Sequence, residues 1–401
     1  MADNKDKKVL NVPALRFPEF NREWEKCKFG DIATGFDYGM NAAAKPYDGQ
    51  NKYIRITDID EASSTYNNED VVSPDGTLSE NYVVNERDIL LARTGASTGK
   101  SYLYRKSDGK LYFAGFLIRA NVAEHNPYFV FSQLHTHRYW RWVSIMSARS
   151  GQPGINSQEY ASFPIYTTTL IEENKISTLL SLIDERISTQ NKIIDKLKTL
   201  IKGIVDTIFT ANKFPKVPFK EIYVRAGEGG TPSTSNPEYY DNGTIPFIKI
   251  DDLQNKYIKT NKDCITELGL QKSSAWIVPA NSIIYSNGAT IGAISINLFP
   301  VCTKQGILGV VPKADINVEF LYYFMTSTAF TKAVERIVTE GTMRTAYLKD
   351  INHILCPVPC SVNQDEIAKL LSTLSEKLEN EVIFQMKLQK QKEFLLSQMF
   401  I

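Results

Sequence analysis

The stretch 172–209 reads EENKISTLLSLIDERISTQNKIIDKLKTLIKGIVDTIF and decides the fold of this chain. It contains no proline. Its apolar residues recur in alternating steps of four and three. They are Ile176, Leu180, Ile183, Ile187, Ile194, Leu197, Ile201, Ile204 and Ile208, and Gln190 fills the one polar place in the series. A 3.5-residue hydrophobic period sustained over this length predicts a coiled-coil helix rather than an ordinary surface helix. At 1.5 Å per residue the helix would be roughly 50–55 Å long.

A second copy of this pattern runs from Asp365 onward. Its apolar members each lie 191 residues after a member of the first series, without a gap, at Ile367, Leu371, Leu374, Leu378, Leu388, Leu395 and Met399. Three polar residues, Glu381, Gln385 and Lys392, interrupt the second seam. Polar seam residues weaken a coiled coil but fix its register. We therefore expect the two helices to pack together.

The globular parts of the chain repeat as well. Residues 53–59 match residues 247–253, and both read as short alternating strands. Residues 88–95 match residues 281–288, and each of these runs ends in a glycine-bearing turn. Strand-like stretches at 112–120 and 302–311 follow, and then helices near 128–146 and 319–339, each ending in a glycine-bearing loop.

This order predicts five segments: a disordered N-terminus at 1–12, domain 1 at 13–166, a central helix at 167–211, domain 2 at 212–359 and a C-terminal helix at 360–401. The fold class is α+β. Two β-rich domains would be separated by two long helices in an antiparallel coiled coil, with an internal pseudo-twofold repeat. Such a dumbbell suits contact with two places on a long duplex.

Composition narrows the class of protein. The chain of 401 residues has a net charge of +1, so composition alone does not indicate a polyanion partner. Five cysteines without a CxxC pair favour a reducing cytoplasm, and four scattered histidines argue against a zinc site. No apolar run approaches 18 residues, so we expect no membrane span.

Catalytic readings fit poorly. The turn from Gly95 to Ser101 resembles a phosphate-binding loop but has three residues between its glycines, where four are needed. Residues 236–239, Asn-Pro-Glu-Tyr, lack the second proline of an amino-methyltransferase motif. No Ser/His/Asp set recurs in both halves. We expect no catalytic residue and no metal ligand.

A DNA-binding interpretation fits better. Arg, Asn and Gln form bidentate contacts with base edges, and Ser, Thr and Lys suit phosphates. The candidates on the strands and glycine-bearing loops are Arg55, Arg93, Thr94, Ser97, Thr98, Lys100, Arg149 and Gln152 in the first half, and Lys249, Ser286, Asn287, Thr290, Thr342 and Arg344 in the second. The alternative is that the glycines only close turns and the polar residues only face water.

The chain resembles the specificity subunit of type I restriction-modification enzymes. The resemblance covers residues from about Val12 to Ile401. It rests on the lead-in VPALRFPEF at 12–20, the segments at 86–95, 229–240 and 245–253, and the two long helices.

The resemblance implies two target recognition domains that each read one half of a split sequence in double-stranded DNA. The subunit would be non-catalytic and would recruit two methyltransferase subunits and two restriction subunits. S-adenosylmethionine, ATP and Mg would then be bound by those partners and not by this chain. The helices would also dock the methyltransferase subunits, through segments that include Ile176, Leu180, Ile183, Ile187, Leu197, Ile367, Leu371, Leu374, Leu378 and Leu388.

Residues 35–40, GFDYGM, replace the GGTPST stretch of the second half, so the two half-sites should differ. The neutral net charge suggests a locally basic face offset by acidic helices, and weak DNA binding by the isolated chain.

Two rival functions remain: a coiled-coil scaffold that binds other proteins, and a self-sufficient methylating enzyme, which the absent donor-binding motif disfavours.

Overall fold

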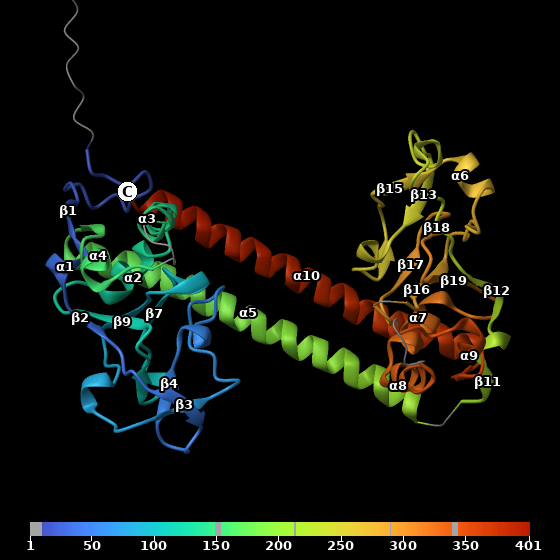
Figure 1. The fold of residues 1–401 in the computed structure, drawn as a ribbon, viewed down its shortest axis with the longest axis horizontal. Coiled ribbons are helices and arrows are strands. Elements are labelled where there is room, and N and C mark those ends of the chain that lie inside the picture. Colours follow the sequence, from blue (N-terminus) through green and yellow to red (C-terminus); the bar gives the residue numbers. More distant parts are fainter. Residues whose placement is uncertain (1–9, 149–153, 212–213, 289, 339–343) are drawn as a thin grey trace, which may run out of the picture. The chain divides into compact units, whose positions relative to one another are not determined.

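The computed structural model describes residues 10–148, 154–211, 214–288, 290–338 and 344–401. The predicted disorder of residues 1–12 falls mostly outside them. The chain divides into two compact units (Figure 1). Unit 1 is Met1–Gln190 with Phe384–Ile401, and unit 2 is Asn191–Ile383. Each unit therefore combines one β-rich domain with part of each long helix.

Domain 1 is built on a four-stranded antiparallel sheet in the order β2-β9-β6-β7. Smaller pairs, β3-β5, β4-β8 and β1-β10, flank this sheet. The strands of unit 1 are β1 Glu25–Lys28, β2 Ala33–Tyr38, β3 Ala43–Pro46, β4 Lys52–Ile54, β5 Val72–Asp75, β6 Asp88–Ala92, β7 Ser101–Leu103, β8 Leu111–Phe113, β9 Leu117–Val122 and β10 Pro164–Thr167. Its helices are α1 Phe29–Ile32, α2 Pro127–Gln133, α3 His137–Ser147, α4 Ser157–Ala161 and the first part of α5 Leu170–Thr210.

Domain 2 repeats this plan with a fifth strand, in the order β12-β19-β16-β17-β14. Its strands are β11 Lys216–Pro218, β12 Tyr223–Glu228, β13 Ile245–Ile248, β14 Tyr257–Ile258, β15 Asp263–Ile265, β16 Ser282–Ser286, β17 Ile294–Asn297, β18 Cys302–Thr303, β19 Ile307–Pro312 and β20 Leu355–Pro357. Its helices are α6 Glu267–Gln271, α7 Val318–Thr326, α8 Thr328–Ile337, α9 Leu348–Ile351 and α10 Ser361–Met399. The parallel pair β13-β18 corresponds to β4-β8, and β11-β20 corresponds to β1-β10.

The predicted single helices near 128–146 and 319–339 are each two helices. Thr136 caps α3 by accepting a hydrogen bond from the Tyr139 amide, and Ser327 caps α8 in the same way from the Phe330 amide. A hydroxyl cap stabilises a new helix start at the point where the chain turns. Apolar periodicity spans the break, and for that reason the sequence pattern did not reveal it.

The strand-like stretches are also divided. After β4 and β13 the backbone turns into a 3₁₀ helix, η1 Ile56–Asp58 or η7 Ile250–Asp252, because the Asp58 and Asp252 carboxylates accept the amides of Arg55 and Lys249. The stretch 112–120 contains two strands of different sheets, β8 and β9. The chain changes sheets at Gly115, whose amide donates to the Met40 carbonyl.

The match between β6 and β16 is shifted by one residue from the sequence prediction. Ile89 pairs with Ala120 and Ile283 pairs with Val310, which places Ala92 opposite Leu117 and Ser286 opposite Ile307. Arg93 therefore corresponds to Asn287, where the sequence had matched it to Ser286. From Asn126 and Asn317 onward the halves correspond at a constant spacing of 191 residues.

This constant spacing preserves the contacts between each domain and its following helix. The Asn126 and Asn317 side chains both cap a helix, α2 or α7. Each also donates through its Nδ2 atom to the long helix, to Asn174 in unit 1 and to Asp365 in unit 2. Their backbone amides donate to Glu173 and Gln364 respectively. Each domain is thus fixed to the start of its own helix by the same set of bonds.

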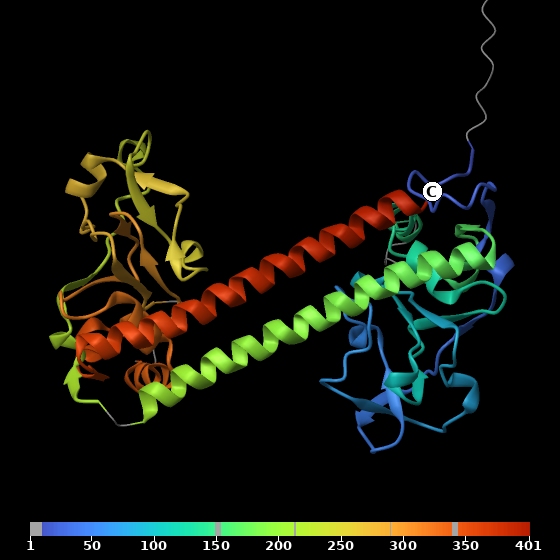
Figure 2. The same ribbon diagram turned by 180° about the vertical axis from the view of Figure 1, so that it is seen from behind.

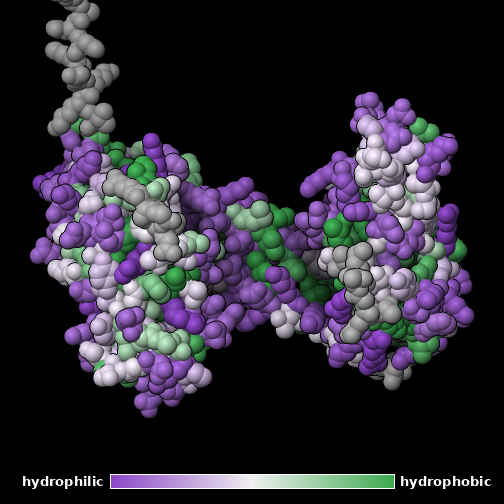
Figure 3. Space-filling model, viewed as in Figure 1, coloured by the Kyte–Doolittle hydropathy of each residue, from purple (hydrophilic) through white to green (hydrophobic). Residues whose placement is uncertain are grey.

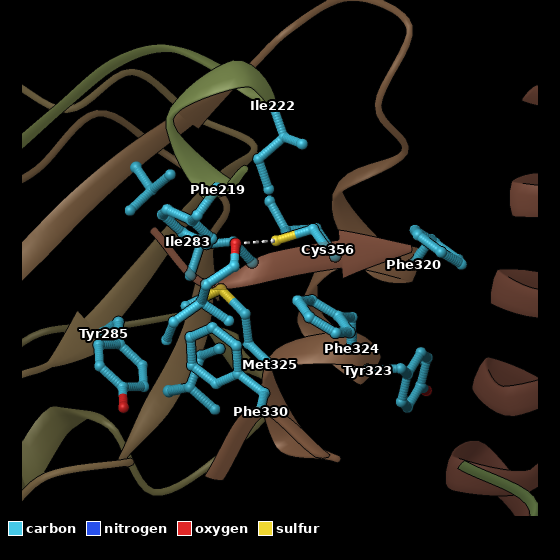
Figure 4. Packing of buried hydrophobic residues seen from close by; sticks show 14 of the residues in the cluster. Phe219, Ile222, Ile283, Tyr285, Phe320, Tyr323, Phe324, Met325, Phe330 and Cys356 are labelled. Atoms are coloured by element: carbon cyan, nitrogen blue, oxygen red, sulfur yellow. Dashed lines mark hydrogen bonds between the residues drawn. The ribbon is translucent and has the colours of Figure 1, made fainter. Parts of the chain in front are cut away.

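Buried hydrophobic side chains fill each unit. In unit 2, Phe320 and Phe324 of α7 pack with Phe219 and Phe330 against Ile283 of the sheet (Figure 4). In unit 1 two clusters lie on opposite faces of the sheet, because alternate residues of β6 point to opposite sides: Ile89 and Leu91 to one cluster, Leu90 and Ala92 to the other.

The long helices pack antiparallel. In unit 1, Ile176 and Leu180 of α5 share a cluster with Leu396 and Met399, near the end of α10. In unit 2, Val205 near the end of α5 clusters with residues near the start of α10. The predicted seam is confirmed. Ile176, Leu180, Ile183, Leu371 and Leu388 are buried, and Ile187, Leu197, Ile367, Leu374 and Leu378 are partly buried.

The end of α10 docks on domain 1, so the C-terminus lies beside β1 and α3 (Figures 1 and 2). Phe400 contacts Trp24 and Phe129. The same contact occurs in unit 2, where Phe209 at the end of α5 packs on Phe320. Among the described residues, no helix is both long enough and apolar enough to cross a membrane.

Candidate nucleic-acid interface

The turn between β6 and β7 carries most of the candidate residues of domain 1. It contains η3 Gly95–Ser97, and it turns at Gly95 and Gly99, whose φ angles are +69° and +93°. A side chain rarely adopts this conformation, and a Cβ at Gly99 would lie 2.7 Å from Val143. The turn therefore needs its second glycine for both backbone and space.

Two buried tyrosines hold this turn in place. The Tyr160 hydroxyl donates to the Ala92 carbonyl at 2.6 Å and accepts the Gly99 amide at 3.2 Å. The Tyr139 hydroxyl donates to the Gly99 carbonyl at 2.8 Å. Burial raises the pKa of both phenols, so both remain neutral donors. The turn is thus a fixed platform.

The same turn meets the later glycine-bearing loop. Thr94 forms a β-bridge with Gly154, and the Ile155 amide donates to the Arg93 carbonyl at 2.9 Å. In unit 2 the equivalent Ala346 amide donates to the Asn287 carbonyl. The structure therefore brings together the two segments that the sequence pattern had selected separately, and it does so in both domains.

The cations in domain 1 have different partners. Arg55 is paired with Asp58 at 2.8 Å and with Asp70 at 3.4 Å, and the hydrogen bond that it donates to Asp58 raises its pKa. Lys100 is paired with Glu61 at 3.1 Å. Arg93 instead stacks over the Tyr38 ring, 4.7 Å from its centroid. Within the described residues, Arg93 has no carboxylate partner.

The other candidates of domain 1 differ in exposure. Thr94 and Ser97 are half-buried, whereas Thr98 is buried and its hydroxyl donates to the Gly95 carbonyl. Arg149 and Gln152 lie outside the described residues, as does Thr342 of domain 2. Lys249 of domain 2 is paired with Asp263 at 2.9 Å and is 41% exposed.

In domain 2, Ser286 and Asn287 are each only 1% exposed. The Asn287 side chain donates to the Ala346 carbonyl at 3.1 Å, and its buried Oδ1 atom finds no hydrogen-bond partner in the part of the chain that the structure describes. Asn287 holds the later loop against the sheet. It occupies the position at which domain 1 has Arg93.

Thr290 and Arg344 come together beside a cavity of about 320 Å³. Apolar side chains of the sheet and of α8 line much of it, and Glu335 adds a carboxylate. Both Thr290 and Arg344 are exposed. Of the candidates in domain 2 that the structure describes, these two are the side chains that face solvent at the turn.

Sequence reasoning missed the exposed aromatic residues near these turns. Tyr38 is 42% exposed and Phe116 is 59% exposed. The DNA-binding interpretation rested on polar residues in loops that recur in both halves, and neither aromatic has an aromatic counterpart in domain 2. A signal existed for Tyr38, because it belongs to the stretch 35–40 in which the two halves diverge.

The expectation of acidic helices is wrong. Helix α5 carries six acidic and six basic residues, and α10 carries six acidic and five basic residues. The helices therefore do not offset a basic charge on the domains, and a domain cation such as Lys100 is paired with a carboxylate of its own domain, Glu61. No cluster of three or more potential metal ligands occurs within the described ranges.

The architecture defines a class. Two related β-rich domains each present a rigid turn and a later loop at one end of a sheet, and each is followed by a long helix. This is a duplicated two-domain architecture, with one turn-and-loop site in each half.

The chain belongs to the family described as the type I restriction modification DNA specificity domain, which matches residues 21–199 and 216–387. It is similar to the MjaIX specificity subunit of a type I restriction enzyme from Methanocaldococcus jannaschii, with 30% identity over 45% of this chain and 44% of that protein. It thus spans less than half the length of that relative. The MjaVIII specificity subunit of the same organism is 22% identical over 94% of this chain and 91% of its own length.

A solved structure of the S subunit of a type I restriction-modification system from M. genitalium has a similar fold. The TM-score is 0.60, with 15% identity over 97% of this chain and 99% of that chain. The α+β fold class predicted from the duplication is confirmed.

Proposed function

We propose that this chain is the non-catalytic DNA-specificity subunit of a type I restriction-modification system. Each β-rich domain reads one half of a bipartite site in double-stranded DNA. The observation that carries the proposal is that the specificity-domain family matches the chain twice, once on each half. The paired turn and loop at one end of each sheet supply the polar groups for the contact.

The two half-sites differ in sequence. Equivalent positions in the two domains carry different side chains, with Arg93 in domain 1 and buried Asn287 in domain 2. Tyr38 likewise corresponds to Glu228. Each precedes a glycine whose amide donates to the carbonyl of the first residue of the neighbouring strand in the sheet, β9 or β19. Different side chains at one structural place favour an asymmetric target.

The catalytic partners are two methyltransferase subunits, which dock on the long helices, and two restriction subunits. S-adenosylmethionine, ATP and Mg belong to those partners. The seam residues pack inside the helix pair, so docking uses outward-facing apolar side chains instead. Such residues include Leu182, Leu200, Leu370 and Phe394, and apolar side chains are seen on the surface of the helices in Figure 3.

We place the complex in the cytoplasm, where the host DNA is found. The five cysteines, at positions 27, 264, 302, 356 and 360, are all free thiols, which fits a reducing compartment.

The test is the genome-wide map of adenine methylation in cells with and without this chain, with its methyltransferase partner expressed in both. We expect methylation of one split, asymmetric motif that disappears with the chain. An unchanged map, with an active methyltransferase, would favour a protein-binding scaffold held on a coiled coil.

A further inference from the structure

We propose that Arg93, held by Tyr38, reads a guanine in the half-site of domain 1, and that Phe116 makes an apolar contact with the neighbouring base pair. This inference rests on the proposed function. It names the base, the side chain that reads it and the domain responsible.

The three side chains, Tyr38, Arg93 and Phe116, come from the same end of three neighbouring strands of the sheet. Tyr38 ends β2 and Arg93 follows β6, while Phe116 precedes β9, the strand between them. The Arg93 amide donates to the Phe116 carbonyl at 3.0 Å, which extends the β6-β9 ladder by one residue. The trio therefore rests on a hydrogen-bonded framework and not on a free loop.

The alternation of side chains puts all three on one face. Leu91 and Ile118 are paired and belong to the cluster beneath the helices. Arg93 and Phe116 lie two residues beyond them, and Tyr38 is paired with Ile118. Among the described residues, α4 covers this face only as far as Ser157, whose amide donates to the Tyr38 hydroxyl at 3.3 Å, so the three side chains lie just beyond the end of α4.

A local irregularity of β2 aims Tyr38. The register of β2 against β9 shifts between Gly35 and Asp37, and Phe36 between them has a φ of +56°. A positive φ is unusual for a bulky residue, and bulges redirect the side chains that follow them. Here the shift places the Tyr38 ring under the Arg93 guanidinium, 4.7 Å from its carbon.

This arrangement suits guanine recognition. Stacking on an aromatic ring holds a guanidinium in one plane while leaving its N–H groups free to donate. A guanidinium presented in this way can donate two hydrogen bonds to the O6 and N7 atoms of guanine in the major groove. Of the three cationic candidates in domain 1 that are described, Arg55 and Lys100 are neutralised by carboxylates and Arg93 is not.

Domain 2 cannot make this contact. The three equivalent positions hold Glu228, Asn287 and Gly306. The Glu228 carboxylate accepts the Gly306 amide at 2.7 Å, and Asn287 is buried. These three positions are held by internal bonds and carry neither a cation nor an aromatic ring. The guanine contact made by an arginine on a tyrosine at this place is therefore confined to the half-site of domain 1.

The test is methylation mapping with the full chain and its methyltransferase partner, comparing the wild type with Arg93→Lys. Lysine keeps the charge but lacks the planar pair of donors, so we expect methylation to tolerate other bases at one guanine of one half-site, with discrimination reduced roughly tenfold or more. The other half-site should be unaffected. Arg22→Lys is the matched control, since Arg22 is an exposed arginine that precedes β1.

Tyr38 is tested as a positioning residue. Tyr38→Phe keeps the ring and should preserve the discrimination. Tyr38→Leu should relax the selection for guanine at the same position as Arg93→Lys does. A merely structural tyrosine would lower methylation at all positions together. Phe116→Ala should weaken selection at the adjacent base pair.

A wild-type map without a split motif would defeat the proposed function itself. A split motif that Arg93→Lys leaves unchanged would overturn the inference alone. If the variant abolishes all methylation, the wild-type complex is titrated with duplexes that carry 7-deazaguanine, which lacks the N7 acceptor, at each guanine in turn. Weakened binding at one guanine of one half-site supports the inference, and equal binding throughout refutes it.

Discussion

The guanidinium of Arg16 donates two hydrogen bonds to the Glu172 carboxylate, at 2.6 and 2.8 Å. Both side chains are buried, at 8% and 1% exposure. Glu172 lies in the first turn of α5, so this pair ties the segment before β1 to the start of the central helix. Trp24 and Thr168 add further hydrogen bonds to the same carboxylate.

Replacing Arg16 with methionine should therefore destabilise unit 1 strongly. Removal of one partner leaves a buried carboxylate without its counterion, which typically costs about 3 kcal/mol or more. Denaturant unfolding of the purified chain measures the change. Lys175→Met is the control, because the Lys175–Glu19 pair is half exposed and should contribute nothing measurable. Equal effects of the two changes would contradict the prediction.

Unit 1 should lose stability as the pH rises above neutrality. The hydrogen bond that the His125 ring donates to the Glu173 carboxylate raises the pKa of His125 above its ordinary value of 6.5, although burial acts in the opposite direction. A raised folded-state pKa contributes stability that is complete below pH 6.5 and is lost as the pH rises through the folded value.

Glu173→Gln should abolish this dependence, which is measured as the difference in unfolding midpoint between pH 6 and pH 9. Unit 2 provides an internal control, since Ile316 and Gln364 take the places of His125 and Glu173 and cannot titrate. The prediction fails if the wild type and the variant change in parallel between the two pH values.

The two copies of the helix seam should be equally sensitive to truncation. Leu180 and Leu371, which are equivalent, are 1% and 0% exposed. Truncation to alanine should cost about 2–5 kcal/mol at either position. Leu182→Ala and Leu370→Ala are the controls, because these side chains are 57% and 50% exposed. Hydrogen exchange should assign the loss to unit 1 for Leu180 and to unit 2 for Leu371. A loss shared evenly by both units would argue against this assignment.

Two equivalent glycines should tolerate alanine unequally. The amides of Gly99 and Gly292 make the same backbone bond, to the last residue of β6 or β16, and both have positive φ angles. The conformation alone costs roughly 1–2 kcal/mol for alanine. At Gly99 a Cβ would also meet Val143 at 2.7 Å, whereas at Gly292 nothing lies within 4 Å. Calorimetry should find the larger loss for Gly99→Ala, and the reverse order would contradict this account.

The isolated chain should bind its target DNA weakly. Its net charge is +1, and the basic candidates Arg55, Lys100 and Lys249 are already paired with carboxylates. Phosphate contacts supply much of the affinity of DNA-binding proteins. Fluorescence anisotropy at physiological salt should give micromolar or weaker binding, and a large gain when methyltransferase subunits are added. Nanomolar binding by the chain alone would be incompatible with this view.

The sequence predicted the duplication and the seam, because these depend on periodicity and spacing. Leu180 and Leu371 could be found in this way. The capping hydroxyls of Thr136 and Ser327 could not, since apolar periodicity continues across the break in each helix. Arg93 was identified as a candidate, but its stacking on Tyr38 depends on a one-residue shift in β2 that no local pattern encodes. The burial of Ser286 and Asn287 was missed because the structural alignment of β16 with β6 differs by one residue from their best sequence alignment.

The constant spacing of 191 residues from Asn126 and Asn317 onward shows where the duplicated halves have kept the same length. Between the two halves of one chain, nothing has been inserted or lost in the capping asparagines, the short helices or the long helix. The sheets before them have not kept step, since Arg93 and Asn287 are 194 residues apart while Gly99 and Gly292 are 193 apart. The number of residues has thus changed in the sheets and their turns, and it has stayed constant in the segments that pack each domain on its long helix. A new recognition preference can arise by changing a turn, without any readjustment of the helices that follow it.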